Sequence, residues 1–532
     1  MAELFWPADI IPSSVEWKIV DSTAVFNSAL SGVTRTVSRP GTRLACTMNF
    51  QALSGQDRGR VQSVLANLRG RSNRIWLYDA SYTQRGAFPA AELVENNTFA
   101  SATGWTSGAY HSLVLQDRVM RVARSVTGTS APALYETAGN TPTTYAGYAS
   151  RAFLREGRGT FTSTGTRIGT TAGGSYAGTD TSGYGLKTTQ SSSGTSTSLF
   201  FTLQDSQTSG TVAGDYFDVL YTSLARCAVV DNGINALTYS DQIDNAAWIK
   251  TKCTCAGADA NAFTAPDGTL TGDRLVETSD AGNEYHYITG YVTKPASVQW
   301  WCIYGAFRAG DGGTSRPQVT LKIGDISHYF SCNFNLSAGT MGTPFNFGSA
   351  SSAKAYMQDL GGGWYYCVVV GILPAAVTGI NNQYFVTDSS GSTLYTGNGA
   401  GNIGAWRLGA AASQYPVRLT QTTTAATTGT TQTGVTLRLK ALPSSTNSLL
   451  LPGDWVECSG QLNMVTAPLN SDAAGLGFLQ LQRPFTTAPA DNAPVIINRP
   501  MGRFLLAEEE VGWSSRPGVL SDFFISFVED IA

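Results

Sequence analysis

The chain begins and ends with segments in which apolar and polar residues alternate. A period of two, which predicts half-buried β-strands, is seen in Leu44, Cys46, Met48 and Phe50 and again in Phe523, Ile525 and Phe527. Each segment follows the sequence Ser-Arg-Pro-Gly, at residues 38–41 and 515–518. Pro and Gly in succession favour a turn. We therefore expect both ends to contribute strands to one sheet, with the rest of the chain inserted between them.

Residues 54–70 have the spacing of an amphipathic helix. The apolar face consists of Val61, Val64, Leu65 and Leu68. Ser54 and Asp57 are placed to cap the start of this helix, and Gly70 is placed to end it. Four arginines lie off the apolar face, namely Arg58, Arg60, Arg69 and Arg71. They predict either a solvated surface or an assembly surface facing an acidic protein ring, where charge sets the register of the contact.

The middle of the chain is rich in Gly, Ser, Thr and Tyr and divides into two modules. Short alternating stretches with polar turns predict jelly-roll β-sandwiches at residues 92–232 and 233–420. The Thr-rich residues 421–434 predict a tether. The predicted fold is mainly β: a split hub domain, residues 1–91 and 435–532, of barrel or sandwich type with one helix, interrupted by two inserted sandwiches.

Composition supports this class and argues against several functions. A chain of 532 residues is too long to fold around a single hydrophobic core. A content of 14% charged residues with 57 Gly and 22 Tyr is typical of all-β assemblies. The net charge of −3 provides no general basic field, so we expect no nucleic-acid sequence recognition. No run of about 18 apolar residues predicts a membrane span, and residues 1–7 lack a secretory pattern. The eight scattered cysteines predict buried free thiols and no metal site.

Candidate catalytic groups do not converge on a reaction. The three histidines, His111, His286 and His328, lie in alternating strands near Tyr and favour core or surface positions over a general base. Residues 399–404 match GxGxxG, but neither a helix nor an acid at the required distance follows them. A carboxylate pair for glycoside hydrolysis could be drawn from Asp267, Glu277 or Glu284, but nothing selects one. We therefore predict no enzyme activity and no cofactor.

Several aromatic residues have the setting of a sugar-binding platform. Trp300, Trp364 and Tyr365 stand beside turns or glycines, where a flat ring can stack on the C–H face of a sugar. We predict these three residues as the carbohydrate-binding site. Sandwich cores also use tryptophans, and we assign Trp248, Trp301 and Trp406 there.

The two ends of the chain resemble the distal tail protein of long-tailed bacteriophages, the hub that joins tail tube to tail tip. The resemblance is carried by residues 38–41, 68–70, 452–455, 499–502 and 523–530. The middle resembles carbohydrate-binding modules that recur in phage tail proteins. In the second module this likeness is carried by residues 239–248, 265–269 and 363–365, and in the first by its two ends.

The resemblance implies a scaffold with an adhesive function. The implied partners are the tail tube protein, other tail-tip proteins, further copies of the chain in a ring that is commonly hexameric, and host surface polysaccharide. The implied location is the distal end of the tail in the virion, after synthesis in the host cytoplasm. Two alternatives remain open: a tail-associated glycan hydrolase and a trimeric fibre-type receptor-binding protein.

Overall fold

The computed structural model is built mainly of β-strands, which confirms the predicted fold class, and the described residues contain one α-helix, α1 (Gly55–Leu68). The structure describes residues 3–7, 9–21, 23–27, 33–37, 41–94, 97–116, 118–127, 131–143, 146–159, 161, 164–169, 184–192, 198–205, 212–311, 316–423, 429, 431–509, 511–516 and 520–530.

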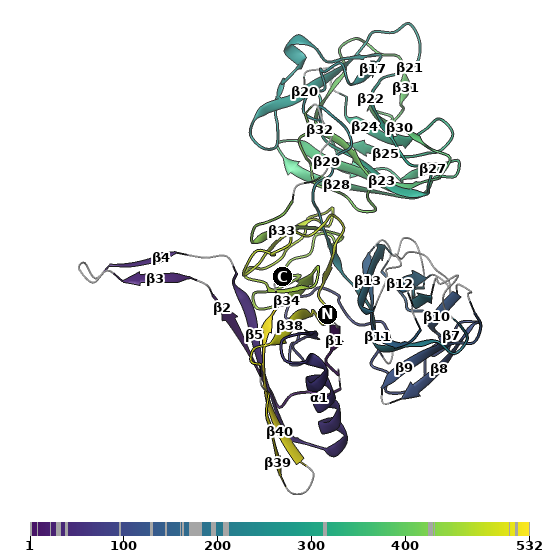
Figure 1. Ribbon diagram of the computed structural model, residues 1–532. Coiled ribbons are helices and arrows are strands. Elements are labelled where there is room, and N and C mark those ends of the chain that lie inside the picture. The colour runs from purple at the N-terminus through teal and green to yellow at the C-terminus, as the bar shows by residue number, and fades with distance from the viewer. Residues whose placement is uncertain are drawn as a thin grey trace.

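Strands from both ends of the chain form one sheet, here called the terminal sheet (Figure 1). Its order is β1 (Glu3–Phe5), β6 (Arg74–Leu77), β38 (Gly502–Leu506), β40 (Leu520–Glu529), β5 (Arg43–Leu53) and β2 (Ser14–Val20), with β39 (Trp513–Arg516) paired to β40. Met48 lies opposite Ile525 and Cys46 opposite Phe527, all buried. The predicted sharing of a sheet is therefore confirmed, while residues 38–40 and 517–519 of the two turn phrases lie outside the described residues.

Helix α1 packs its predicted apolar side onto the terminal sheet. Val61, Leu65 and Leu68 are buried in one cluster with Phe50 and Ile525. The helix ends at Leu68, and Arg69 adopts a left-handed backbone with φ 48° that closes the last turn.

A second terminal sheet lies beside the first. Its strands, in order, are β35 (Gln461–Met464), β34 (Trp455–Cys458), β37 (Pro494–Ile496), β16 (Ala228–Val230), β33 (Thr436–Lys440) and β36 (Gly477–Gln480). Strand β16 corrects the prediction that residues 228–230 belong to the first module, because it pairs with β33 and β37. Three consecutive apolar residues have no period, so the sequence could not assign them to a sheet. We call the two terminal sheets with α1 the terminal unit.

The first sandwich lies beside the terminal unit (Figure 1). One of its sheets consists of β13 (Gly185–Ser192), β11 (Gly147–Arg158), β15 (Tyr216–Arg226), β9 (Val119–Arg124) and β8 (His111–Gln116). The other consists of β12 (Thr164–Gly169), β14 (Phe200–Asp205), β10 (Ala131–Glu136) and β7 (Trp105–Ser107). Phe99, Trp105 and Phe201 pack together between the two sheets.

The second sandwich follows in the chain. Its inner sheet consists of β18 (Cys253–Thr254), β20 (Leu270–Glu277), β32 (Asn402–Ala411), β23 (Gln299–Ala309), β29 (Trp364–Leu373) and β28 (Ser351–Gly361), with β19 (Phe263–Thr264) paired to β20. Its outer sheet consists of β17 (Ile249–Thr251), β22 (Tyr287–Thr293), β30 (Gly379–Thr387), β24 (Gln318–Gly324), β25 (Tyr329–Asn335) and β26 (Thr340–Met341), with β27 (Phe345–Phe347) paired to β25. A ribbon of β21 (Glu284–Tyr285) and β31 (Leu394–Tyr395) and the 3-10 helix η1 (Gly257–Asp259) complete it.

Each sandwich packs one sheet against the terminal unit. For the first sandwich the contact is the aromatic cluster Phe5, Trp76, Phe153, Tyr221 and Met501. Beside it a buried ion pair joins Arg151 Nη2 to Glu457 at 2.7 Å. For the second sandwich, Tyr304 and Tyr366 of the inner sheet share a cluster with Ala474 and Leu476 of the terminal unit.

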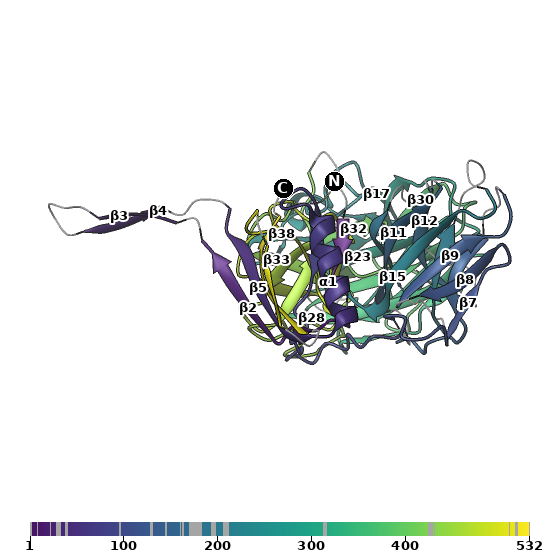
Figure 2. The same ribbon diagram turned by 60° about the horizontal axis from the view of Figure 1, so that its bottom comes forward.

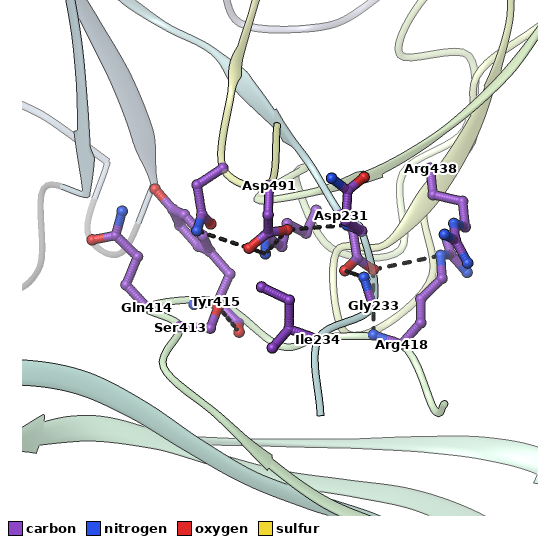
Figure 3. A network of polar contacts seen from close by, with 12 residues as sticks. Asp231, Gly233, Ile234, Ser413, Gln414, Tyr415, Arg418, Arg438 and Asp491 are labelled. Atoms are coloured by element: carbon purple, nitrogen blue, oxygen red, sulfur yellow. Dashed lines mark hydrogen bonds and ion pairs between the residues drawn. The ribbon is translucent and has the colours of Figure 1, made fainter. Parts of the chain in front are cut away.

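Polar contacts hold together the two connecting segments through which the chain enters and leaves the second sandwich (Figure 3). The carboxylate of Asp231 accepts hydrogen bonds from the backbone N–H of Gly233 at 3.0 Å and of Arg418 at 3.3 Å. The Tyr415 hydroxyl accepts a hydrogen bond from Gln190 of the first sandwich at 2.8 Å. The predicted tether at 421–434 is wrong at its described ends, because Thr422 and Gln432 are buried and hydrogen-bonded to Ser240 and Asn232.

A two-stranded arm extends away from the rest of the molecule (Figures 1 and 2). It consists of β3 (Ala24–Asn27) and β4 (Thr34–Val37), which pair with each other. Val25, Phe26 and Val37 on this arm are each more than half exposed, at 58%, 58% and 52%.

Candidate functional site

The outer sheet of the second sandwich has one face that the rest of the described chain leaves open. Alternate residues of its strands point into the core, and Val319, Leu321, Ile323 and Tyr384 are fully buried there. Because successive side chains of a strand point to opposite faces, their neighbours face outward. These outward residues are not apolar: they include Thr320, Lys322, Asn381, Gln383, Ser331 and Asn333.

Strand register brings the outward residues into two rows. Tyr287, Phe385, Thr320 and Asn333 lie side by side across four strands. Thr289, Gln383, Lys322 and Ser331 form the next row. The polar members of these rows, Thr320, Asn333, Gln383, Lys322 and Ser331, form with Asn381 the floor of a cleft of about 640 Å³, here called the outer cleft.

Aromatic rings form two walls of the outer cleft. On one side Tyr287 and Phe385 have ring centroids 4.8 Å apart, and Tyr285 packs against Phe385 and is 49% exposed. On the other side Tyr329 stacks on Phe347 at 5.0 Å, beside Phe345, which is 51% exposed. Flat rings above a floor of amides and hydroxyls are the combination that binds a ring with one apolar face and polar edges.

The polar groups of the floor are fixed to different degrees. Asn333 Nδ2 donates to the Thr320 hydroxyl at 3.0 Å. The amides of Asn381 and Gln383 make no side-chain hydrogen bond with any described residue. Lys322 Nζ lies 4.0 Å from the ring centroid of Tyr329, and burial lowers the pKa of its ammonium. The floor therefore offers a ligand both donors and acceptors.

The sequence-predicted platform residues do not meet in this cleft. Trp364 is buried at 2% exposure, and its Nε1 donates to the carbonyl of Thr264 at 2.9 Å. Its ring fits over Gly272, where an added Cβ would lie 2.8 Å from it. The prediction of Trp364 as a platform is therefore wrong, because its ring is enclosed in the sandwich. The three glycines before it have positive φ and form the turn between β28 and β29.

The other two predicted aromatics also serve packing. Trp300 is half-buried and packs on the cluster that joins the inner sheet to the terminal unit. Tyr365 is half-buried against the core of the second sandwich. Trp248, Trp301 and Trp406 are buried, as predicted.

Two of the four arginines in and after α1 bind within the chain. Arg60 holds Asp9 with two hydrogen bonds of 2.7 and 2.8 Å, and Arg118 of the first sandwich contacts the same carboxylate at 3.1 Å. Arg71 Nε donates to the carbonyl of Leu506 at 3.0 Å. Arg60 and Arg71 therefore have partners within the chain, while Arg58 is half-buried and Arg69 exposed, and the assembly surface stays a prediction.

The predicted candidates for acid–base chemistry lie in two structural networks: His111 is in the first sandwich, whereas His286 and Glu277 are in the second, where both contact Tyr395. His111 contacts buried Asp205 at 3.1 Å, and Arg124 pairs with the same carboxylate at 2.7 Å. His286 contacts Asp280 at 2.7 Å. Burial raises the pKa of Glu277, but hydrogen bonds from Arg316, Asn398 and Tyr395 outweigh it and hold that pKa below its usual value.

Two further properties concern the described part of the chain as a whole. Its cysteines are buried free thiols, as predicted. No helix in it is long and apolar enough to cross a membrane, and no three potential metal-ligating side chains gather in the residues that the structure describes.

The outer cleft could have been found from a different sequence signal. The middle parts of strands β24, β25 and β30 alternate, and their polar members are amides, hydroxyls and a lysine between buried residues. Such alternation predicts an outward face, but the rows form only when the hairpin of β24 and β25 pairs with β30, and β30 with β22.

No family model matches the chain, and no curated protein matches it. Among solved structures, the chain is similar to the N-terminal tandem of carbohydrate-binding modules CBM22-1 and CBM22-2 from Paenibacillus barcinonensis Xyn10C. Sequence identity is 11%, and the match covers 62% of this chain and 100% of that one with a TM-score of 0.20. A likeness at this score carries no argument about function. The outer cleft itself must carry the functional assignment.

Proposed function

We propose that this protein is a structural hub at the distal end of a phage tail, whose second sandwich binds host cell-surface carbohydrate in the outer cleft. The observation that carries the binding part is the pair of aromatic walls on either side of a floor of free amides. This is the surface chemistry that a sugar chain requires, with stacking on its C–H faces and hydrogen bonds to its hydroxyls.

A site of this kind gains strength from repetition. A single shallow sugar site binds with a Kd on the order of 1 mM, or about −4 kcal/mol. Several copies held in a ring raise the overall affinity by about 10²–10⁴ without any new contact, provided that the glycan spans the sites. This arithmetic links the adhesive sandwich to the proposed ring-forming hub.

The ring part of the proposal is supported by two exposed surfaces of the terminal unit. The arm β3–β4 exposes Phe26, and a two-stranded ribbon with open edges is marginally stable alone in water. A hollow of about 590 Å³ on the terminal sheet exposes Trp513 and Phe524, at 49% and 65%. A contact between two different surfaces of identical chains is head-to-tail, and such contacts close into a ring where the rotation between neighbours allows it. The proposed partners are copies of this chain, the tail tube protein and other tail-tip proteins.

The binding part is tested with the full chain and two matched tyrosines. Tyr285 is 49% exposed and lines the outer cleft, whereas Tyr291 is 61% exposed on the same sandwich and does not line it. We expect Tyr285→Ala to lower retention on host polysaccharide by about tenfold, in line with the loss of one aromatic contact, and Tyr291→Ala to leave it unchanged. Equal retention of both variants and the parent protein would contradict the assignment of the cleft.

The assembly part is tested by counting copies. Mass photometry and particle images of the full chain should show a closed ring. Phe26→Asp should reduce the ring to smaller species, because it places a charge where an apolar contact is expected, while Ile326→Asp on the second sandwich should not. A monomer at every concentration would contradict the ring.

A further inference from the structure

Lys322 occupies the middle of the outer cleft without an anionic partner. In the register of the outer sheet it lies between Gln383 and Ser331, on the central strand of the floor. Among the described residues no carboxylate lies within ion-pair distance of its ammonium. Its Nζ lies over the ring of Tyr329, 4.0 Å from the ring centroid.

The one carboxylate that lines the cleft is engaged elsewhere. Asp325 Oδ1 accepts hydrogen bonds from the backbone N–H of Ser327 at 2.8 Å and of His328 at 2.6 Å. These bonds hold the carboxylate in the turn between β24 and β25. Asp325 also lies 3.5 Å from the Nδ1 of His328, and no described carboxylate pairs with Lys322. The ammonium of Lys322 is therefore a charge of the floor that has no counter-ion among the described residues.

A bound ligand would cover this ammonium. No described residue accepts a hydrogen bond from its three N–H donors, and a ligand lying along the floor would have to supply acceptors in place of solvent. Covering a charge without a hydrogen-bonded counter-charge is costly, whereas a carboxylate forms strong charge-assisted bonds with it. The aromatic face of Tyr329 compensates only in part, since a cation–π contact contributes about 0.5–2 kcal/mol.

We propose that the outer cleft selects an acidic saccharide, with a uronic-acid carboxylate placed at Lys322 and neighbouring hydroxyls at Asn381 and Gln383. The inference rests on the proposed carbohydrate-binding function and names its ligand class. The aromatic walls hold the sugar rings, and Lys322 discriminates between acidic and neutral chains of the same backbone.

The test compares polysaccharides that differ in one functional group. Acidic bacterial polysaccharides containing uronic acids are immobilised, each beside its carboxyl-reduced form, and retention of the full chain is measured at low and high salt. We expect about tenfold tighter binding to the acidic member of a pair, with a preference that falls as salt rises. Binding to the reduced member that equals or exceeds binding to the acidic one would overturn the inference.

Two variants of Lys322 test whether this residue causes the preference for acidic polysaccharide. Lys322→Gln should abolish the preference, and Lys322→Arg should keep it. Lys354→Gln is the matched control, because Lys354 also lies over a tyrosine ring, 5.0 Å above Tyr356, but on the inner sheet. Preference retained in Lys322→Gln overturns the role of Lys322.

The outcomes separate the inference from the function on which it rests. Retention of neutral polysaccharide alone, lost in Tyr285→Ala, overturns the acidic ligand and leaves carbohydrate binding in place. Absence of binding to every member of the set overturns both. The comparison of acidic and reduced forms uses the unaltered protein, so an unfolded variant does not leave the ligand class untested.

Discussion

The two sandwiches have the same arrangement but different outward faces. In each sandwich one sheet packs against the terminal unit, with Phe153 in the contact of the first and Tyr366 in that of the second. On the outward sheet of the first, register brings Tyr135, Thr202 and Arg167 together as a row with one aromatic ring. The second instead has aromatic walls on both sides of a cleft. The scaffold is thus shared, and the outward side chains decide which sandwich can hold a ligand.

The clefts of the first sandwich lie where it meets the terminal unit. One, of about 670 Å³, is lined by Asp9, Arg60 and Arg118. Another, of about 530 Å³, is lined by Glu457 and Trp76. These positions place the clefts of the first sandwich at its junction with the terminal unit, whereas the outer cleft of the second sandwich lies on its open face.

The largest expected effect comes from the buried ion pair of the first junction. Arg151→Ala leaves Glu457 buried without its cation, which should cost about 3–5 kcal/mol. Thermal unfolding and limited proteolysis should show a lowered melting temperature and release of the first sandwich. The double change Arg151→Met with Glu457→Gln should recover much of the loss. Unchanged proteolysis of Arg151→Ala would contradict the view that this ion pair fixes the first sandwich to the terminal unit.

Trp364→Ala should unfold or loosen the second sandwich. Loss of a buried indole and its hydrogen bond to Thr264 costs about 3 kcal/mol or more. Trp364→Phe should keep both the fold and glycan retention, since the ring lies away from the outer cleft. A folded Trp364→Ala protein that has lost binding would instead restore Trp364 as a platform.

A smaller effect is expected from the aromatic residues that differ between the outward faces. Tyr287→Ala should weaken glycan retention by about 0.5–1.5 kcal/mol, because it removes part of one wall. Tyr135→Ala, at a comparable half-buried position of the first sandwich, should leave retention unchanged. Equal losses in both would show that the first sandwich also binds the ligand.

The smallest effect belongs to the partly exposed bridge between α1 and the first sandwich. Asp9→Asn removes the shared partner of Arg60 and Arg118 and should cost about 1 kcal/mol or less. Glu16→Gln, which disrupts the exposed pair with Lys18, should have no measurable effect. Differential scanning calorimetry compares the stability of the two variants. A loss of stability in Asp9→Asn that is close to the loss in Arg151→Ala would show that this bridge is a main support of the junction.

The sequence by itself determined the alternating strands at the two ends of the chain, the position of the helix and which face of each is buried. Met48 and Ile525 alternate with polar neighbours, and burial of one face then follows from the period of the strand. Val61, Leu65 and Leu68 have the helical period in the same way. These features are local, so a single segment contains the information that specifies them.

Tertiary structure decided which faces stay open and which aromatic rings a ligand can reach. Trp364 follows three glycines, a setting typical of an exposed platform, but Gly272 and Phe263 of another strand pair enclose its ring. The outer cleft forms when β22, β24, β25 and β30 pair in register, and their residues are up to about a hundred positions apart in the chain. Whether a ring is buried depends on what covers it, and the covering residues come from segments that the local pattern does not identify.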